Sequence, residues 1–409
     1  MNTKKVTLRL SSTTTQALLD KYQTASFSDA LQKCIKDSIL HHTFFTKNKR
    51  RCTPKKTLQR VRTENLPLTE RKSVRINKDA LDFLQNYYGV NLSISEVLRC
   101  CITDVLHDVG KPQKLKPSNN LFYMAGQKNP QMQEILNGCF NSLKTKHKFS
   151  GYVEPFTGTA NVLLHKPERL KREWLNDNSV YLVNVLSVLR DYPLELILAV
   201  WKRGYSKATF NMNKAMLKGR FSFKEKKATL ISRAAAFYFN RYASHYGDGK
   251  SYKKKMKQDT FQHKLDTIGI LSERLQNTQI KKRDALYYCK TLKGISDHLI
   301  YFDSPYIGSE EYYRENNSKG IIFSSHTALR NRVEQLRRKN ICVISYRTTA
   351  SDSMRQNGIT DEYVRHTLNR LFCGKDYHYI TTPYIKGQIE IVIATVPFEG
   401  STPFNQPLV

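Results

Sequence analysis

The stretch His298–Tyr306, HLIYFDSPY, joins a run of apolar and aromatic residues to a carboxylate, a proline and an aromatic ring. Residues 299–302 are typical of a buried strand. Asp303 follows at the point where that strand should end. A carboxylate beside an aromatic ring can act on a bound substrate, but Asp, Ser and Pro also form ordinary turns. Taken alone, this stretch is better interpreted as a turn, and other motifs are needed to favour an active site.

Two further stretches have residue types that suit a bound ligand. Residues 151–164, GYVEPFTGTANVLL, read as a short strand, a small-residue turn at Gly158 and an apolar helix. Glycine lets the backbone approach a ligand closely, although one such turn is weak evidence. Asp177 follows an apolar residue and precedes a helix in EWLNDNSVYLVNVL. This carboxylate suits the binding of ribose hydroxyls, and it equally suits the N-cap of that helix.

These stretches lie in a region that alternates short strands with helices from about Leu121 onward. Helical spacing relates Leu329, Val333 and Leu336. The predicted buried strands are 152–153, 298–302, 341–345 and 389–396. This alternation predicts an α/β fold.

The first hundred residues contain a strand–helix–helix pattern twice. Residues 5–11, KVTLRLS, and 71–77, RKSVRIN, alternate apolar and polar side chains, as strands do. Two segments with helical spacing follow each strand. Ser12 and Asn77 are the predicted caps of the first helix in each copy, and Ser28 and Ser95 are the predicted starts of the second.

This duplicated pattern resembles the ribbon-helix-helix DNA-binding fold of the Arc and MetJ repressors. The resemblance implies an antiparallel ribbon over four helices, formed within one chain or between two chains as a homodimer. Outward side chains of such a ribbon read bases in the major groove. The implied readers are Lys5, Thr7, Arg9, Arg71, Ser73 and Arg75. The alternative is a small helical dimerisation module with ordinary charges on its edge strands.

Composition limits the partners of the chain. Its 409 residues include 67 Lys and Arg against 35 Asp and Glu, a net charge of +32. This excess favours a polyanion, with an anionic membrane surface as the competing interpretation. No apolar run approaches the ~18 residues of a spanning helix, and no secretory signal is expected. The eight cysteines form no CxxC pair, so reduced thiols in a cytoplasmic protein are expected, with no metal site.

Five segments, in this order, resemble the Dam-like adenine-N6 DNA methyltransferases: LFYMAGQK (121–128), VEPFTGTA (153–160), LNDN (175–178), FYFNR (237–241) and DSPY (303–306). The resemblance implies a Rossmann-like α/β methyltransferase domain over residues 119–409, with a helical target-recognition insertion at about 180–262. A small α+β ribbon-helix-helix-like domain would occupy residues 1–110. The implied cofactor is S-adenosyl-L-methionine, and the implied substrate is adenine in double-stranded DNA.

The same resemblance assigns roles to single residues. Cofactor-binding residues would be Met124, Ala125, Gly126, Lys128, Glu154, Pro155, Phe156, Gly158, Asp177 and Asp284. Arg241 would contact DNA. In the catalytic motif, Asp303 and the backbone carbonyl of Ser304 would accept the two hydrogens of the adenine amine and expose its lone pair. Pro305 would fix the backbone, and Tyr306 would stack on a flipped-out base.

Some positions depart from the family pattern and keep alternatives open. Met124, Gln127, Ala160 and Ser304 stand where the family usually has tryptophan, glycine, glycine and proline. One alternative is a DNA-binding regulator with a degenerate methyltransferase fold. Another is a methyltransferase for RNA adenine or cytosine N4. The sequence after residue 241 also leaves the family pattern, so the recognition sequence and a restriction nuclease partner stay open.

Overall fold

The computed structural model describes residues 3–42, 70–106, 121–122, 128–253, 265, 267–308, 326–383 and 387–408. Among these, the side chains of residues 41, 42, 70, 71, 246 and 353 are not described. Met124, Ala125, Gly126 and Gln127 therefore lie outside the described residues.

An antiparallel two-stranded ribbon forms near the N-terminus. Strand β1 (Thr3–Leu10) pairs with β2 (Glu70–Asn77), with Thr7 opposite Ser73 and Arg9 opposite Arg71. The alternation explains the faces, because the apolar residues of both strands are buried, and Lys5, Thr7, Arg9, Ser73 and Arg75 are exposed. The two strands pair within a single chain, so the ribbon needs no second copy.

Helices cover the buried face of this ribbon. They are α1 (Ser12–Tyr22), α2 (Phe27–Asp37), the short π-helix η1 (Ser38–His42), α4 (Lys78–Tyr88) and α5 (Ile94–Leu106). We refer to residues 3–42 and 70–106 as the N-terminal module.

The structure corrects one predicted helix cap and two predicted helix starts. Ser11 caps α1 through the backbone N–H of Thr14 at 3.0 Å, and Ser26 caps α2 through the N–H of Asp29 at 3.3 Å. Ser12 is therefore the first residue of α1 and not its cap, and α2 begins at Phe27, one residue before the predicted Ser28. Helix α5 begins at Ile94, one residue before the predicted Ser95. Asn77 caps α4 as predicted.

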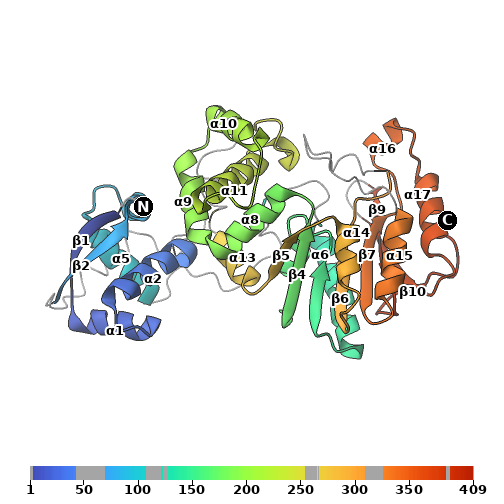
Figure 1. Ribbon diagram of the computed structural model, residues 1–409, viewed down its shortest axis with the longest axis horizontal. Coiled ribbons are helices and arrows are strands. Elements are labelled where there is room, and N and C mark those ends of the chain that lie inside the picture. The colour runs from blue at the N-terminus through green and yellow to red at the C-terminus, as the bar shows by residue number, and fades with distance from the viewer. Residues whose placement is uncertain are drawn as a thin grey trace.

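A mostly parallel eight-stranded sheet forms the second part of the chain (Figure 1). Its strands are β3 (Gly151–Glu154), β4 (Arg172–Asp177), β5 (Gln279–Lys282), β6 (His298–Phe302), β7 (Ile341–Arg347), β8 (His378–Pro383), β9 (Ile389–Ala394) and β10 (Thr402–Pro403). The spatial order is β10-β8-β9-β7-β6-β3-β4-β5. Strands β7, β6, β3, β4 and β5 run parallel, whereas β9, β8 and β10 join antiparallel.

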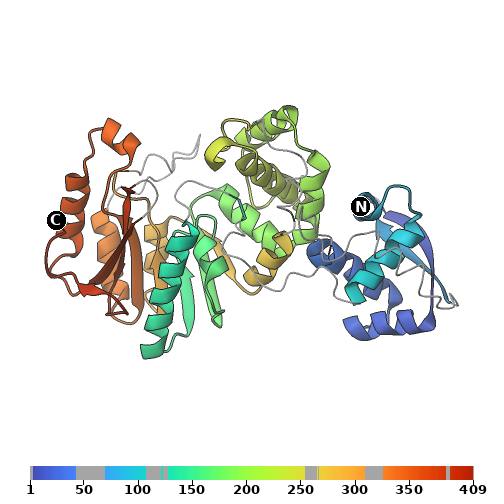
Figure 2. The ribbon, with the colours of Figure 1, turned by 180° about the vertical axis from the view of Figure 1, so that it is seen from behind.

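Helices cover both faces of this sheet because its strands are apolar on both sides. In β6, Leu299 and Tyr301 face one apolar core, whereas Ile300 and Phe302 face the other. The first core includes α6 (Pro130–Lys146), α7 (Asn161–His165) and α13 (Ile268–Leu275). The second includes α14 (Ala285–Thr291), α15 (His326–Leu336), α16 (Asp352–Gln356) and α17 (Asp361–Phe372). Figure 2, in which the molecule is seen from behind, shows α6 on the face of the sheet opposite to α14 and α15.

A group of helices enters the chain between β4 and β5. It comprises α8 (Val180–Asp191), α9 (Pro193–Arg203), α10 (Lys207–Lys218), α11 (Lys227–Tyr242) and the short η2 (His245–Gly247). In Figure 1 this helical insertion lies between the N-terminal module and the sheet. The Trp201 ring meets that of Phe83 edge-on with centroids 5.4 Å apart, and Lys202 Nζ lies 2.5 Å from an Asp79 oxygen. The N-terminal module is thus packed on α9.

The structure confirms a mixed α/β fold with a central, mostly parallel sheet. Strands predicted at 152–153, 298–302, 341–345 and 389–396 occur as β3, β6, β7 and β9. The seven described cysteines are free thiols, and six of them are buried. Among the described residues, no helix is both long and apolar enough to cross a membrane.

Candidate active site

The strand order places two predicted motifs side by side. From β3 the chain proceeds through β4 to β5 in one direction, whereas β6 and β7 lie on the other side of β3. The order therefore reverses between β3 and β6, and ligands of open α/β sheets bind at the carboxyl ends of strands at such a point. Residues 155–160 follow β3 there, and residues 303–306 follow β6.

The turn after β3 is held by the carboxylate of Asp177. Gly158 and Ala160 have positive φ angles of 53° and 58°. Asp177 Oδ2 accepts the N–H of Gly158 at 2.8 Å, and Oδ1 accepts the N–H of Ser179 at 2.8 Å. The α8 cap is Ser179, not Asp177, so the interpretation of Asp177 as the helix N-cap is wrong. Burial raises the pKa of Asp177, although these backbone N–H bonds act in the opposite direction.

Asn176, which the sequence did not single out, ties the surrounding loops together. Its side-chain amide donates to the backbone oxygens of Pro155 and Arg283, each at 3.0 Å. The backbone carbonyl of Asn176 accepts the N–H of Thr157 at 3.0 Å. The Arg283 N–H in turn bonds the Asp177 carbonyl at 3.3 Å. The ends of β3, β4 and β5 are therefore fixed relative to one another.

The other residues predicted for the cofactor have mixed surroundings. Glu154 is buried, accepts the Tyr152 hydroxyl at 2.8 Å, and has its pKa raised to about 8 by burial. Phe156 is half-buried, and Pro155 is buried. Asp284 caps α14 by accepting the N–H of Tyr287 at 2.8 Å. Asp284 thus directly follows Arg283, whose N–H bonds the backbone carbonyl of Asp177.

The turn after β6 meets Lys128 from a distant part of the chain. Lys128 Nζ lies 2.9 Å from Asp303 Oδ1, and it also donates to the Tyr306 hydroxyl. The Lys128 carbonyl accepts from the side-chain amide of Asn161 at 3.0 Å, which links it to the start of α7. Ser304 is buried, and its hydroxyl has no hydrogen-bond partner among the described residues. The structure thus brings Lys128, Asp303, Ser304 and Tyr306 together.

Two charged residues that the sequence analysis missed complete this cluster. Glu390 of β9 lies 3.5 Å from Lys128 Nζ and accepts the Tyr306 hydroxyl at 3.1 Å. Arg347, at the end of β7, has its guanidinium carbon 5.0 Å from the centroid of the Tyr306 ring. A single glutamate within the apolar strand IEIVIA was the available signal, because a charge is rarely buried without a partner.

The charges of this cluster perturb one another. Burial raises the pKa of Asp303 and Glu390 raises it further, whereas Lys128 and Arg347 oppose them. Burial alone would lower the pKa of Lys128, but Asp303 and Glu390 together raise it well above its usual range. Lys128 therefore stays protonated, and it neutralises part of the negative charge of Asp303.

Tyr306 is buried, with only 5% of its surface exposed. Lys128 Nζ lies 4.7 Å from its ring centroid, besides the guanidinium of Arg347. A base stacking on this ring would compete with these contacts. The stacking role of Tyr306 remains a prediction.

The residues predicted to bind DNA lie elsewhere. Lys5, Thr7, Arg9, Ser73 and Arg75 are on the exposed face of the ribbon, where the Thr7 and Ser73 hydroxyls are 3.0 Å apart. The Arg71 side chain lies outside the described part. Arg241 of α11 donates to the Gly247 carbonyl at 2.9 Å and lies 4.8 Å from the Phe237 ring.

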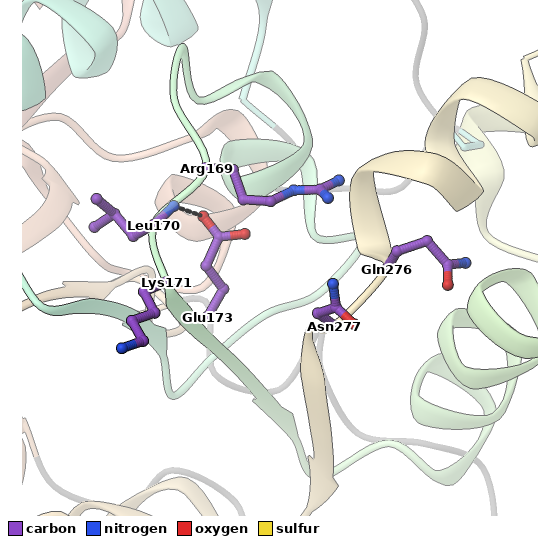
Figure 3. A pocket seen from close by; sticks show the side chains of 6 residues that line it. All are labelled: Arg169, Leu170, Lys171, Glu173, Gln276 and Asn277. Atoms are coloured by element: carbon purple, nitrogen blue, oxygen red, sulfur yellow. Dashed lines mark hydrogen bonds between the residues drawn. The ribbon is translucent and has the colours of Figure 1, made fainter.

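A separate hollow lies at the opposite edge of the sheet (Figure 3). It measures about 280 Å³ and is formed by residues at or just before the amino ends of β4 and β5, namely Arg169, Leu170, Lys171, Glu173, Gln276 and Asn277. Since these residues are at the amino ends of the strands, the hollow is not part of the site at the carboxyl ends.

The groups at the carboxyl ends suit S-adenosylmethionine. Asp177 is half-buried and offers carboxylate lone pairs beside a turn that needs positive φ angles at Gly158 and Ala160. A carboxylate at this place can accept hydroxyl hydrogens, as ribose binding requires.

The comparison with protein families agrees with the cofactor that these residues suit. The family described as D12 class N6 adenine-specific DNA methyltransferase matches residues 125–371. A solved structure from Listeria monocytogenes, assigned as a class I S-adenosylmethionine-dependent methyltransferase, shares 12% identity. That comparison covers 97% of this chain and 92% of the other, with a TM-score of 0.31, too low to carry an argument. No curated protein matches significantly.

The family match spans more than half of the chain and includes both motif-bearing strand ends. We conclude that the chain belongs to the D12 class N6 adenine-specific DNA methyltransferases, enzymes that transfer a methyl group from S-adenosylmethionine to adenine N6 in DNA.

Proposed function

We propose that the protein methylates a flipped-out adenine at a specific site in double-stranded DNA, with Asp303 and the carbonyl of Ser304 as the groups that contact the amine. The observation that carries this proposal is the placement of Asp303 and Lys128, 2.9 Å apart, at the strand-order reversal. The adenine must leave the base stack, because N6 cannot be reached inside a duplex.

The proposed chemistry concerns the adenine amine. Its lone pair is delocalised into the ring, so the amine is a poor nucleophile. Asp303 and the Ser304 carbonyl would accept its two hydrogens and orient the lone pair toward the methyl donor. Only the carbonyl of residue 304 is required, so serine serves in place of proline. Pro305 limits the backbone freedom of this turn.

Asp177, Gly158, Phe156 and Asp284 are the proposed residues around S-adenosylmethionine. Bound there, this cofactor supplies an activated methyl group on a sulfonium. Asp177 would accept ribose hydroxyls, while its bonds to Gly158 and Ser179 keep the turn in place. Lys128 would hold Asp303 in orientation through their ion pair. We propose Met124, Ala125 and Gly126 as further contacts from the sequence resemblance alone.

The N-terminal module is proposed to be a ribbon-helix-helix-like DNA reader over residues 1–110. Support comes from the exposed Lys5, Arg9 and Arg75 on a two-stranded ribbon. A ribbon of this width fits the major groove, where arginine pairs with guanine. Since the ribbon closes within one chain, a homodimer is not needed for it. The helical insertion, residues 180–262 in our assignment, would contact the target site.

The remaining proposals concern context. The cytoplasmic location is proposed from the cysteine pattern of the sequence, and a restriction nuclease is a candidate partner. Duplex DNA is favoured over RNA because the exposed ribbon arginines suit a major groove that A-form RNA does not offer.

Incorporation of a tritiated methyl group tests the proposal. The wild type should label duplex DNA and yield N6-methyladenine on digestion, whereas Asp303→Ala should not. Labelling of RNA, or of cytosine, would move the activity to the alternative substrates. Turnover by Asp303→Ala close to that of the wild type would refute the catalytic role of Asp303.

A further inference from the structure

A second carboxylate is buried behind the catalytic turn. Glu390 is 1% exposed and lies in β9, where it is directly opposite Arg347 of β7. An ionised carboxylate in an apolar strand is costly unless charged or hydrogen-bonding partners surround it. The residues that contact Glu390 therefore indicate its role.

Each oxygen of Glu390 meets a residue of the active-site cluster. Oε1 accepts the Tyr306 hydroxyl at 3.1 Å, and Oε2 lies 3.5 Å from Lys128 Nζ. Lys128 Nζ also lies 2.9 Å from Asp303 Oδ1. One ammonium group is therefore shared by two carboxylates, and the Tyr306 hydroxyl contacts both Lys128 and Glu390.

Arg347 balances the second negative charge. Its Nε lies 3.8 Å from Glu390 Oε1, so the cluster contains two cations and two anions. With Glu390 present, the Lys128 charge is divided between two carboxylates. Without it, Lys128 would act on Asp303 alone and weaken Asp303 as a hydrogen-bond acceptor.

We propose that Glu390 is a positioning residue for methyl transfer, which holds Lys128 and Tyr306 and so keeps the Asp303 carboxylate available to the adenine amine. The inference rests on the proposed role of Asp303 and deepens it. Glu390 touches neither substrate in this scheme and acts only through Lys128 and Tyr306.

The geometry also has a consequence for pH dependence. Glu390 raises the pKa of Asp303, whereas Lys128 and Arg347 lower it. Removing the charge of Glu390 should therefore lower the pKa of Asp303. The decrease of kcat at acidic pH, which we call the acidic limb of the pH profile, should then occur at a lower pH. The titratable and charged groups around Asp303 are Lys128 before α6, Glu154 of β3, Tyr301 of β6, Tyr306 of the same turn, Arg347 of β7 and Glu390 of β9.

Kinetics of full-length Glu390→Gln test this proposal. We expect kcat to fall about tenfold, as for the loss of one charged hydrogen-bonding partner. KM for S-adenosylmethionine and for duplex DNA should stay within about twofold, and the acidic limb should move to lower pH.

Glu173→Gln is the matched control. Glu173 is 3% exposed, lies at the amino end of β4, and pairs with Lys166 at 3.2 Å and Arg274 at 2.5 Å. This variant should lose stability, as loss of a buried ion-pair partner does, but keep the kcat and pH limb of the wild type.

Glu390→Asp keeps the negative charge, and it is the variant to measure if Glu390→Gln does not fold. It should lower kcat less and leave the acidic limb near its wild-type position. The proposal would be overturned if Glu390→Asp, or a folded Glu390→Gln, had the kcat of the wild type. It would also be overturned if the decrease of kcat at acidic pH occurred at the same pH in Glu390→Gln as in the wild type. If Asp303→Ala is inactive while Glu390→Gln is normal, only this inference fails. Absence of methylation by the wild type would instead overturn the proposed function.

Discussion

At the scale of single residues, Asp177 combines two roles that mutation can separate. Its carboxylate holds the N–H groups of Gly158 and Ser179, and we propose that it also binds ribose. Asp177→Asn keeps one acceptor but loses the charge. We expect binding of S-adenosylmethionine to weaken by ~1.5–3 kcal/mol, measured by calorimetric titration.

Asp248→Asn is the control, because Asp248 also accepts a backbone N–H, that of Lys250 at 2.8 Å, but belongs to the helical insertion. This variant should bind S-adenosylmethionine as tightly as the wild type. Equal affinity of Asp177→Asn and the wild type would leave Asp177 with the turn-holding role alone.

Glu154 should make stability depend on pH. Its pKa is raised from the ordinary 4.5 to about 8 in the folded chain, so the folded state keeps a proton that the unfolded chain releases. Stability should therefore be greatest below the unfolded pKa and fall as pH rises toward about 8.

Glu154→Gln should remove this dependence. Urea unfolding should be measured at several pH values. The free energy of unfolding of the variant should rise relative to that of the wild type by up to ~1.4 kcal/mol per pH unit between the unfolded pKa and about 8. Parallel stability curves for the two proteins would show that Glu154 does not titrate in this range.

At the scale of elements, the β1–β2 ribbon should carry sequence preference. Arg9→Ala with Arg75→Ala should reduce discrimination among duplexes, by ~1–3 kcal/mol for each arginine that grips a guanine. The measurement is binding of full-length protein to a randomised duplex library at two salt concentrations.

Lys146→Ala with Lys339→Ala is a control that removes the same charge from exposed sites on the sheet domain. If the ribbon arginines touch only phosphates, affinity would fall evenly across sequences, with a smaller salt slope. Unchanged affinity and preference would favour the dimerisation module.

Elements with a strong apolar period were predictable, and weakly buried ones were not. Alternating Val6, Leu8 and Leu10 revealed β1, and the apolar run of β6 revealed its strand. Strand β5, with the sequence QIKK, is mostly exposed at a sheet edge and carries no such period. The capping serines of α1 and α2 were ambiguous because each has another serine close by in sequence.

Candidate site residues could be predicted from the sequence where they belong to one short motif. Asp303 and Asp177 were candidates because each lies at the end of an apolar strand. The pairing of Lys128, Asp303 and Glu390 was not, since three segments far apart in sequence supply them and only the sheet topology brings them together. Sequence spacing contains no information about such contacts.

At the scale of the whole molecule, the N-terminal module and the helical insertion should behave as one unit. Trp201 of α9 packs against Phe83 of α4, beside the Asp79–Lys202 ion pair. Trp201→Ala removes the larger ring and should destabilise this contact by ~2 kcal/mol, less than for a fully buried tryptophan.

Hydrogen exchange should show faster exchange in both α9 and α4 of Trp201→Ala. Met212→Ala, at an exposed position of α10, should leave α4 unchanged. An increase confined to α9 would mean that the two parts are not coupled through this contact.

Sequencing of genomic DNA from cells that express the protein, with modified bases called, tests the central claim most directly. We expect N6-methyladenine at one recurring sequence in cells with the wild type, and none above background with Asp303→Ala. Genomic DNA without N6-methyladenine, in cells where the folded wild-type protein is present, would contradict the assignment of a DNA adenine methyltransferase.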